Sequence, residues 1–432
     1  MSTLLRICTA GSVDDGKSTL IGRLLHDSQA VYEDQISSVK AASKNRTAGP
    51  IDFSLFTDGL RAEREQGITI DVAYRYFATA RRKFILADTP GHEQYTRNMA
   101  TGASTAELAI LLVDARQGVK EQSRRHARIA RLLGITHFVV AVNKMDLVDF
   151  DKDIYDGICA EFAEILKGAQ FHAIPMSALM GDNVISLSER TPWFTGPSLL
   201  AYLETVDVDV DVTAKPFRFP VQLVLRPHLD FRGYAGQLQS GTVRVGDAVT
   251  VWPSGRTTAI KRIVTFDGDL QEAFAPMSVT LTLEDEIDIS RGDMLVSGPV
   301  QVAQRFEADI VWMDERPLDP KRMYLLKHTS RVVTADVART LELNGIGQAT
   351  VSTSRPLIFD AYQDNRFTGA FVLIDPATNF TAGAGMIRAA EQVKASTGRE
   401  GAAERLARIA RSAPNEAEAV EALRVALEEL LG

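Results

Sequence analysis

Short apolar runs, each ending in a polar or glycine-rich loop, are the main feature of the first half of the chain. Residues 4–9, 84–87 and 139–142 are such runs, with the length and composition of buried strands. Stretches with helical spacing, such as the one that begins at Lys17, separate them. Strand and helix patterns alternate in this way up to about residue 205, which predicts a doubly wound, mostly parallel α/β sheet domain over residues 1–205.

The pattern changes after residues 206–211, where valine and aspartate alternate. We interpret this stretch as a charged linker rather than as an edge strand. From Phe217 onward helical periodicity disappears, and short β-patterned segments are separated by glycine turns. With a break at residues 298–299, the pattern predicts two antiparallel β-barrels, over residues 216–298 and 304–388.

The last stretch, residues 389–432, is rich in alanine, glutamate and arginine, and Pro414 divides it into two helical patterns. The second pattern places apolar residues on one helical face, namely Val420, Leu423, Leu427, Leu430 and Leu431. We therefore expect a short C-terminal helical tail. Its apolar face suits packing on its own protein as well as docking of a partner, and the sequence does not choose between the two.

Bulk composition agrees with an ordinary globular protein of two or three domains, since 45% of the 432 residues are hydrophobic and 24% are charged. The chain shows neither a signal-like start nor an apolar run approaching the ~18 residues of a membrane helix. Its two cysteines suggest reduced thiols, so we expect a cytoplasmic protein without membrane contact. The net charge of −8 argues against broad binding to nucleic-acid phosphates but does not exclude a local RNA site.

Residues 11–18 read GSVDDGKS and match the phosphate-binding pattern G-x-x-x-x-G-K-[ST] between a predicted strand and a predicted helix. Its glycines let successive backbone N–H groups face an anion at the positive end of the helix. Lys17 then reaches the β- and γ-phosphates, and the Ser18 hydroxyl ligates Mg²⁺. The predicted phosphate-binding residues are Gly11, Ser12, Val13, Asp14, Asp15, Gly16, Lys17, Ser18 and Thr19.

A second apolar run ends at Asp88 and continues as Thr-Pro-Gly-His. A carboxylate at the carboxyl end of a parallel strand lies at the crevice where ligands bind in such sheets. We expect Asp88 to hold Mg²⁺ through water and the Gly91 N–H to bond the γ-phosphate. His92 is the candidate that orients the attacking water, because it directly follows this motif.

Hydrolysis also requires a group that senses the γ-phosphate from a mobile loop. Residues 64–69, read as REQGIT, fit this role, with Thr69 as a further Mg²⁺ ligand and catalytic candidate. Periodicity alone favours a plainer interpretation, a turn leading into an alternating strand at residues 68–74. The neighbouring motifs make us prefer the sensor.

Base selection is predicted by Asn-Lys-Met-Asp at residues 143–146, after a buried strand pattern. The Asp146 carboxylate accepts from guanine N1–H and the exocyclic amine, a donor pair that adenine lacks. Asn143 bonds the guanine edge and the neighbouring loop, while the Lys144 stem packs over the ring. Ser177, Ala178 and Leu179 follow a further strand pattern and bring a backbone N–H to guanine O6. These features predict GTP rather than ATP.

The four loops, followed by two β-barrel patterns, resemble the elongation factor Tu-like translational GTPases. The segment FRGYAG at residues 231–236 is similar to the second domain of that superfamily. Several stretches are closer to one branch, the GTPase subunits of heterodimeric bacterial sulfate adenylyltransferases. They are GSVDDGKSTLIGRLL at 11–25, DGLRAEREQGITIDVAYRYF at 58–77, ADTPGHEQYTRNMATGAS at 87–104, VTFDGDL at 264–270 and DEIDISRGDML at 285–295.

This resemblance implies a P-loop GTPase that requires GTP and Mg²⁺ and works in a heterodimer. The partner is expected to be a small catalytic subunit that carries the ATP and sulfate sites and forms adenosine 5′-phosphosulfate and pyrophosphate. GTP hydrolysis on this chain would supply the driving force, and neither nucleic acid nor membrane is expected as a partner. Two alternatives stay open: a translation factor acting with tRNA and the ribosome, and a GTP-regulated scaffold with negligible turnover.

Overall fold

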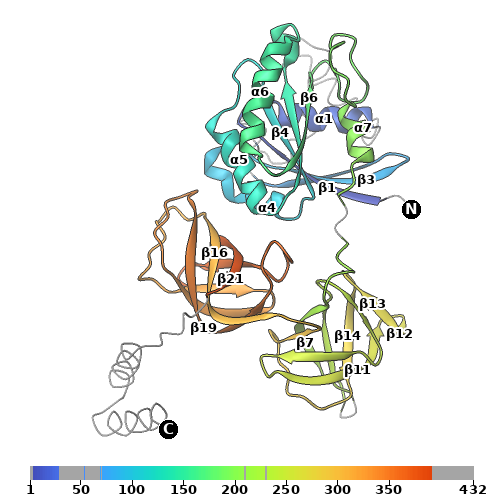
Figure 1. Cartoon of the computed structure of the whole chain (residues 1–432), viewed down its shortest axis with the longest axis vertical. Coiled ribbons are helices and arrows are strands. Elements are labelled where there is room, and N and C mark those ends of the chain that lie inside the picture. The colour runs from blue at the N-terminus through green and yellow to red at the C-terminus, as the bar shows by residue number, and fades with distance from the viewer. Residues whose placement is uncertain are drawn as a thin grey trace. The chain divides into compact units, whose positions relative to one another are not determined.

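The computed structural model describes residues 3–28, 53, 69, 71–208, 211–228 and 231–391 (Figure 1). The chain divides into two units, Met1–Ala389 and Ala390–Gly432, and the elements below belong to the first, apart from the last residue of β21. Of the predicted γ-phosphate sensor, only Thr69 lies within the described residues. The apolar face predicted for the helical tail lies wholly outside them.

A six-stranded sheet with the order β2-β3-β1-β4-β5-β6 forms the first part of the chain. All its neighbouring strands are parallel except β2 and β3. The strands are β1 (Thr3–Ala10), β2 (Ala73–Ala78), β3 (Arg82–Asp88), β4 (Leu108–Asp114), β5 (His137–Asn143) and β6 (Gln170–Pro175). The predicted doubly wound, mostly parallel sheet is therefore confirmed. Of the alternative strand at 68–74, residues 73 and 74 lie in β2, while the described residues 69, 71 and 72 lie in no strand.

Helices cover both faces of this sheet, and the central strand β4 is buried at every position. In β4, Leu108, Ile110 and Leu112 join a core with α1 and α7, while the alternate residues join a second core with α4, α5 and α6. The helices are α1 (Lys17–Asp27), α4 (Thr96–Ser104), α5 (Glu121–Leu132), α6 (Lys152–Ile165) and α7 (Leu199–Thr205), with 3-10 turns at Glu93–Tyr95 and Met145–Val148.

Two antiparallel β-units follow. In the first, β10-β15-β7-β8-β14-β11-β12 form one sheet, and an additional β10–β11 pairing joins it into a ring. Its strands, with a small separate β9–β13 pair, are β7 (Arg218–Leu225), β8 (Gly233–Gln237), β9 (Thr242–Arg244), β10 (Ala248–Trp252), β11 (Arg256–Thr265), β12 (Gly268–Leu270), β13 (Glu272–Phe274), β14 (Ser278–Leu283) and β15 (Met294–Val296).

The second unit is a closed barrel with the order β16-β19-β18-β17-β20-β21. Its strands are β16 (Gln301–Trp312), β17 (Tyr324–His328), β18 (Arg331–Val337), β19 (Ile346–Phe359), β20 (Ala370–Ile374) and β21 (Thr381–Ala390). The predicted pair of antiparallel β-units is thus present, whereas the domain boundaries that we drew stay predictions. Between α7 and β7, the described residues of 206–211 form no strand, as expected of a linker. No helix in the described ranges has the length and apolar character needed to cross a membrane.

Candidate nucleotide-binding site

The loop between β1 and α1 curls into the form that a phosphate cradle requires. Gly16 has φ of 96°, and a Cβ at that position would collide with the Asn143 side chain, so only glycine fits. The Asp15 carboxylate accepts from the Ser12 N–H at 2.6 Å and closes the turn. Lys17 begins α1 and donates to two carbonyl oxygens of the same loop, at Gly11 (3.0 Å) and Ser12 (2.8 Å). Its ammonium therefore lies inside the curl of the loop.

Lys17 is almost fully buried among carboxylates. Its exposed fraction is 7%, and burial lowers the pKa of its ammonium, while the charges of Asp15 and Asp88 act in the opposite direction. Burial in turn raises the pKa of the Asp15 carboxyl. Burying a charged lysine costs free energy unless anions surround it. This part of the loop is therefore suited to a ligand with several negative charges.

The segment after β3 lies directly against this loop. β1 and β3 are parallel, with Thr9 opposite Asp88, so both strands end at the same edge of the sheet. The Thr89 hydroxyl donates to the Thr9 carbonyl at 2.5 Å. A Cβ at Gly91 would collide with the Lys17 ammonium, which places the Gly91 backbone beside the lysine. Two of the predicted motifs are therefore brought together.

His92, Thr69 and Ser18 occupy less constrained positions. His92 caps the 3-10 turn Glu93–Tyr95, where its Nδ1 accepts from the Gln94 N–H at 3.3 Å, and it is half-buried. Thr69 is half-buried outside any helix or strand, and Ser18 is the second residue of α1. Asp88 is 2% exposed and contributes to the charges acting on Lys17. Hydroxyl and carboxylate oxygens are the donors that Mg²⁺ prefers, so the chemistry of this set fits the ion.

Asn143, at the end of β5, joins three of the predicted motifs. Its Nδ2 donates to the Asp15 carbonyl at 2.8 Å, and its Oδ1 accepts from the Ala178 N–H at 2.9 Å. The same amide thus holds the phosphate loop on one side and the predicted base-binding segment on the other. Ser177 and Ala178 are buried, whereas Leu179 is 50% exposed. Asp146 lies half-buried in the 3-10 turn Met145–Val148.

Asp114 is a residue of this site that our sequence reasoning missed. It ends β4 with a side chain only 1% exposed, and Lys144 bonds it at 3.0 Å while also bonding the Asp14 carbonyl. Burial acts to raise the pKa of the Asp114 carboxyl, but hydrogen bonds from Arg116 and Lys144 hold it well below its usual range. A carboxylate after a buried strand was the signal that identified Asp88, and the same rule identifies Asp114.

Helix α5 also contributes residues that contact the phosphate loop, although they belong to no sequence motif. His126 is fully buried, and its Nδ1 accepts from the Gly11 N–H at 3.2 Å. Its Nε2 lies 2.8 Å from the side-chain Nε2 of Gln122. Ser123 meets the Ser12 hydroxyl at 3.3 Å. Burial, assisted by Lys17 and Arg125, lowers the pKa of His126 to about 3, so this imidazole stays neutral.

The fold and this site define the class of protein. The family described as "Elongation factor Tu GTP binding domain" matches residues 2–206, and the family "GTP-eEF1A C-terminal domain-like" matches residues 334–388. The chain therefore carries a GTP-binding domain of the elongation factor Tu type, as the four loops predicted.

Individual relatives narrow the assignment. The chain is 55% identical over 406 residues to sulfate adenylyltransferase subunit 1 of Teredinibacter turnerae, covering 89% of this chain and 87% of that one. It is 55% identical over 410 residues to the protein of the same name from Vibrio campbellii, covering 89% and 86%. It is also 53% identical over 408 residues to the bifunctional enzyme NodQ of Rhizobium meliloti, of which it spans 64%. The chain belongs to the sulfate adenylyltransferase subunit 1 family, which confirms the branch that the motifs indicated.

Proposed function

We propose that this chain hydrolyses GTP and that the hydrolysis drives synthesis of adenosine 5′-phosphosulfate and pyrophosphate from ATP and sulfate on a small partner subunit. The observation that carries this proposal is the 55% identity, over most of both chains, with proteins named sulfate adenylyltransferase subunit 1. "Subunit 1" implies an enzyme of more than one chain. The elongation factor Tu-type domain supports GTP as the nucleotide on this one.

Energetics explain why such an enzyme needs a GTPase. The bond between phosphate and sulfate in the product is a high-energy mixed anhydride, so the equilibrium strongly favours ATP and sulfate. GTP hydrolysis shifts this balance only if the GTP-bound and later states differ in their affinity for intermediates on the partner. Coupling therefore requires that the state of the nucleotide site changes the surface that the partner touches.

We assign nucleotide binding to the residues that the motifs predicted. The loop of residues 11–19 holds the phosphates, with Lys17 as their counter-charge. The N–H groups of Gly11 and Ser12 instead hold the loop in shape, since they donate to His126 and Asp15. Asp146 accepts from the guanine edge, Asn143 holds the surrounding loops, and the Ala178 region approaches guanine O6. The two hydrogen bonds of the Asn143 amide support this assignment, since they bring the phosphate and base segments to one place.

For hydrolysis, we assign His92 to the attacking water and Gly91 to the γ-phosphate. His92 uses Nδ1 to cap the following turn, which orients the ring and leaves Nε2 for the water. Ser18, Thr69 and Asp88 would hold Mg²⁺, which when bound neutralises charge on the β- and γ-phosphate oxygens. Lys17, beside Gly91, stabilises the charge that develops on the transferring phosphoryl group.

The partner in this proposal is the small catalytic subunit, which forms a heterodimer with this chain and carries the ATP and sulfate sites. We expect the complex to be cytoplasmic, where both nucleotides are abundant. The free thiols of Cys8 and Cys159 agree with a reducing compartment.

The decisive experiment measures adenosine 5′-phosphosulfate formed from ATP and sulfate by purified small subunit, with and without this chain and GTP. We expect product to accumulate beyond the ATP-only equilibrium only when both are present. A non-hydrolysable GTP analogue should leave the equilibrium level unchanged, because it supplies binding without driving force. If product formation ignores both the chain and GTP, the proposal is wrong, and stimulation of GTP hydrolysis by ribosomes becomes the next measurement.

A further inference from the structure

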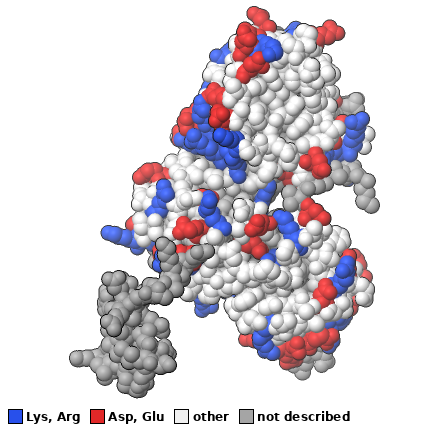
Figure 2. Space-filling model, viewed as in Figure 1, with Lys and Arg blue, Asp and Glu red and all other residues white. Residues whose placement is uncertain are grey.

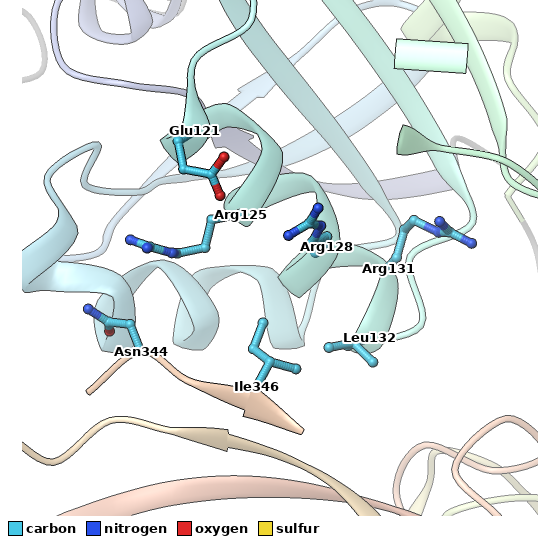
Figure 3. A pocket seen from close by; sticks show the side chains of 7 residues that line it. All are labelled: Glu121, Arg125, Arg128, Arg131, Leu132, Asn344 and Ile346. Carbon is cyan, nitrogen blue, oxygen red and sulfur yellow. The ribbon is translucent and has the colours of Figure 1, made fainter. Parts of the chain in front are cut away.

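Three arginines of α5 line one cavity at the side of the helix that faces away from the sheet. Arg125, Arg128 and Arg131 recur every third residue, so they share one helical face. The cavity measures about 650 Å³ and is also lined by Glu121 and Leu132 of the same helix and by Asn344 and Ile346 at the start of β19 (Figure 3). Lys and Arg side chains gather over the region of α5 in Figure 2.

The charge of this cavity is only partly neutralised. Arg125 pairs with Glu93 at 2.5 Å, and Arg131 donates to two main-chain carbonyls, at Ile165 and Lys167, which carry no net charge. Arg128 is exposed, and within the described ranges no ion pair or hydrogen bond engages its guanidinium. The lining residues thus carry three positive charges and one negative charge, that of Glu121, on a chain whose net charge is −8. The Arg131 guanidinium points away from the other lining side chains (Figure 3).

The walls of the cavity are held in place before anything binds. At the end of α5, the Leu133 carbonyl accepts from the Tyr362 hydroxyl at 2.9 Å in a buried contact. Leu133 and Tyr362 belong to one apolar cluster that continues through Met313 and Met386 of the barrel. A preformed site costs less conformational entropy on binding than a loose one.

The chemistry of the lining specifies the occupant. Guanidinium groups pair with carboxylates through two parallel hydrogen bonds, and Leu132 and Ile346 add an apolar surface beside them. A segment that combines Asp or Glu with an apolar side chain satisfies both. Nucleic acid fits less well, because the apolar Leu132 and Ile346 side chains offer no partner to a run of phosphates.

We propose that this cavity, the arginine face of α5, is the docking site for an acidic segment of the small catalytic subunit. The inference rests on the proposed function, which requires that partner, and adds where and by what chemistry it binds. The opposite face of α5 touches the phosphate loop through Ser123 and His126. Arg125 holds Glu93, the residue that follows His92. Docking here therefore acts on the helix that supports the nucleotide site.

The test reverses the charge of Arg128, which has no partner among the described residues. Purified Arg128→Glu chain, in complex-forming conditions with GTP, is titrated with the small subunit by calorimetry at low and moderate salt. We expect Kd to rise about tenfold or more, because a favourable cross-interface charge pair becomes repulsive. Arg256→Glu is the matched control: it makes the same charge change at an exposed arginine at the start of β11 and should leave Kd within about twofold of wild type.

GTP hydrolysis by the isolated chain should be unchanged in both variants, and their unfolding midpoints should match wild type. A Kd for Arg128→Glu within about twofold of wild type would overturn the docking site, given the size expected for such a pair. So would a variant that loses affinity for an RNA oligonucleotide but not for the small subunit. If wild type binds the small subunit and drives product formation while Arg128→Glu does the same, only the docking site fails. If the wild-type chain neither binds the small subunit nor drives product formation, the docking site and the proposed function are both wrong.

Discussion

Replacing His126 by alanine removes the acceptor that holds the first N–H group of the phosphate loop. The Gly11 N–H donates to the fully buried imidazole at 3.2 Å, and Gly11 is itself buried. Leaving a buried donor unsatisfied costs about 1–3 kcal/mol. At about 1.4 kcal/mol per factor of ten, this corresponds to a change of about 5-fold to 140-fold in an equilibrium constant.

This penalty is divided between two measurable quantities. If the N–H stays buried, the free energy of unfolding falls. If the loop turns the N–H toward water, bound nucleotide must restore the loop, so nucleotide affinity falls and dissociation speeds up. We therefore expect His126→Ala to release a fluorescent GDP analogue faster in stopped flow, with denaturant unfolding accounting for the remainder.

His126→Asn separates the hydrogen bond from the loss of side-chain volume. The Asn amide oxygen accepts at a position similar to Nδ1, so this variant should recover most of the nucleotide affinity even though it also leaves a smaller side chain. The reasoning is refuted if His126→Ala keeps both the wild-type dissociation rate and the wild-type unfolding free energy. It is also refuted if the alanine and asparagine variants agree in both their dissociation rate and their free energy of unfolding.

Four further predictions concern the same domain and the barrel that follows. Lys17→Ala should abolish tight GTP binding, measured by titration, and unchanged affinity would remove the lysine from the phosphate site. His92→Ala should keep nucleotide affinity while slowing hydrolysis by ~10²-fold or more in single-turnover assays; full turnover would end its role. Asp146→Asn should shift preference from GTP toward xanthosine triphosphate in competition binding, because an acceptor becomes a donor. His328, buried with Nε2 at 2.7 Å from the Thr368 carbonyl, has its pKa lowered by burial to about 4. The unfolded chain binds more protons between that value and ~6.5, so the free energy of unfolding should rise as pH rises through this range, by up to ~1.4 kcal/mol per unit. His328→Gln should flatten this dependence in urea titrations.

The sequence predicts those parts of the site in which a particular residue type is needed at a fixed place in a short motif. The loop at 11–18 and the strand ends at Asp88 and Asn143 are of this kind, because a parallel sheet brings its carboxyl ends to one edge. Asp114 obeys the same rule and was recoverable from the run that precedes it. His126 was not, because its role depends on which face of α5 lies under the phosphate loop, a tertiary fact that local spacing does not contain.

The elements of the fold divide in the same way. Continuous apolar runs predicted the buried parallel strands, and glycine-separated short runs predicted the antiparallel units. The cavity beside α5 was beyond reach, since Ile346 joins it from more than two hundred positions away in the sequence. The order in which the barrel strands pair depends on such long-range contacts as well.

The two hydrogen bonds of Asn143 have a practical consequence for anyone who wishes to follow this protein in a mixture of nucleotide-dependent enzymes. Both ends of that amide are committed to holding neighbouring loops, so altering Asn143 dismantles the architecture of the pocket. Asp146 lies in the short turn Met145–Val148 and takes no part in these two hydrogen bonds, so it can be substituted separately. The Asp146→Asn variant is expected to use added xanthosine triphosphate. Its activity could then be started separately from that of the other GTP-consuming proteins in the mixture.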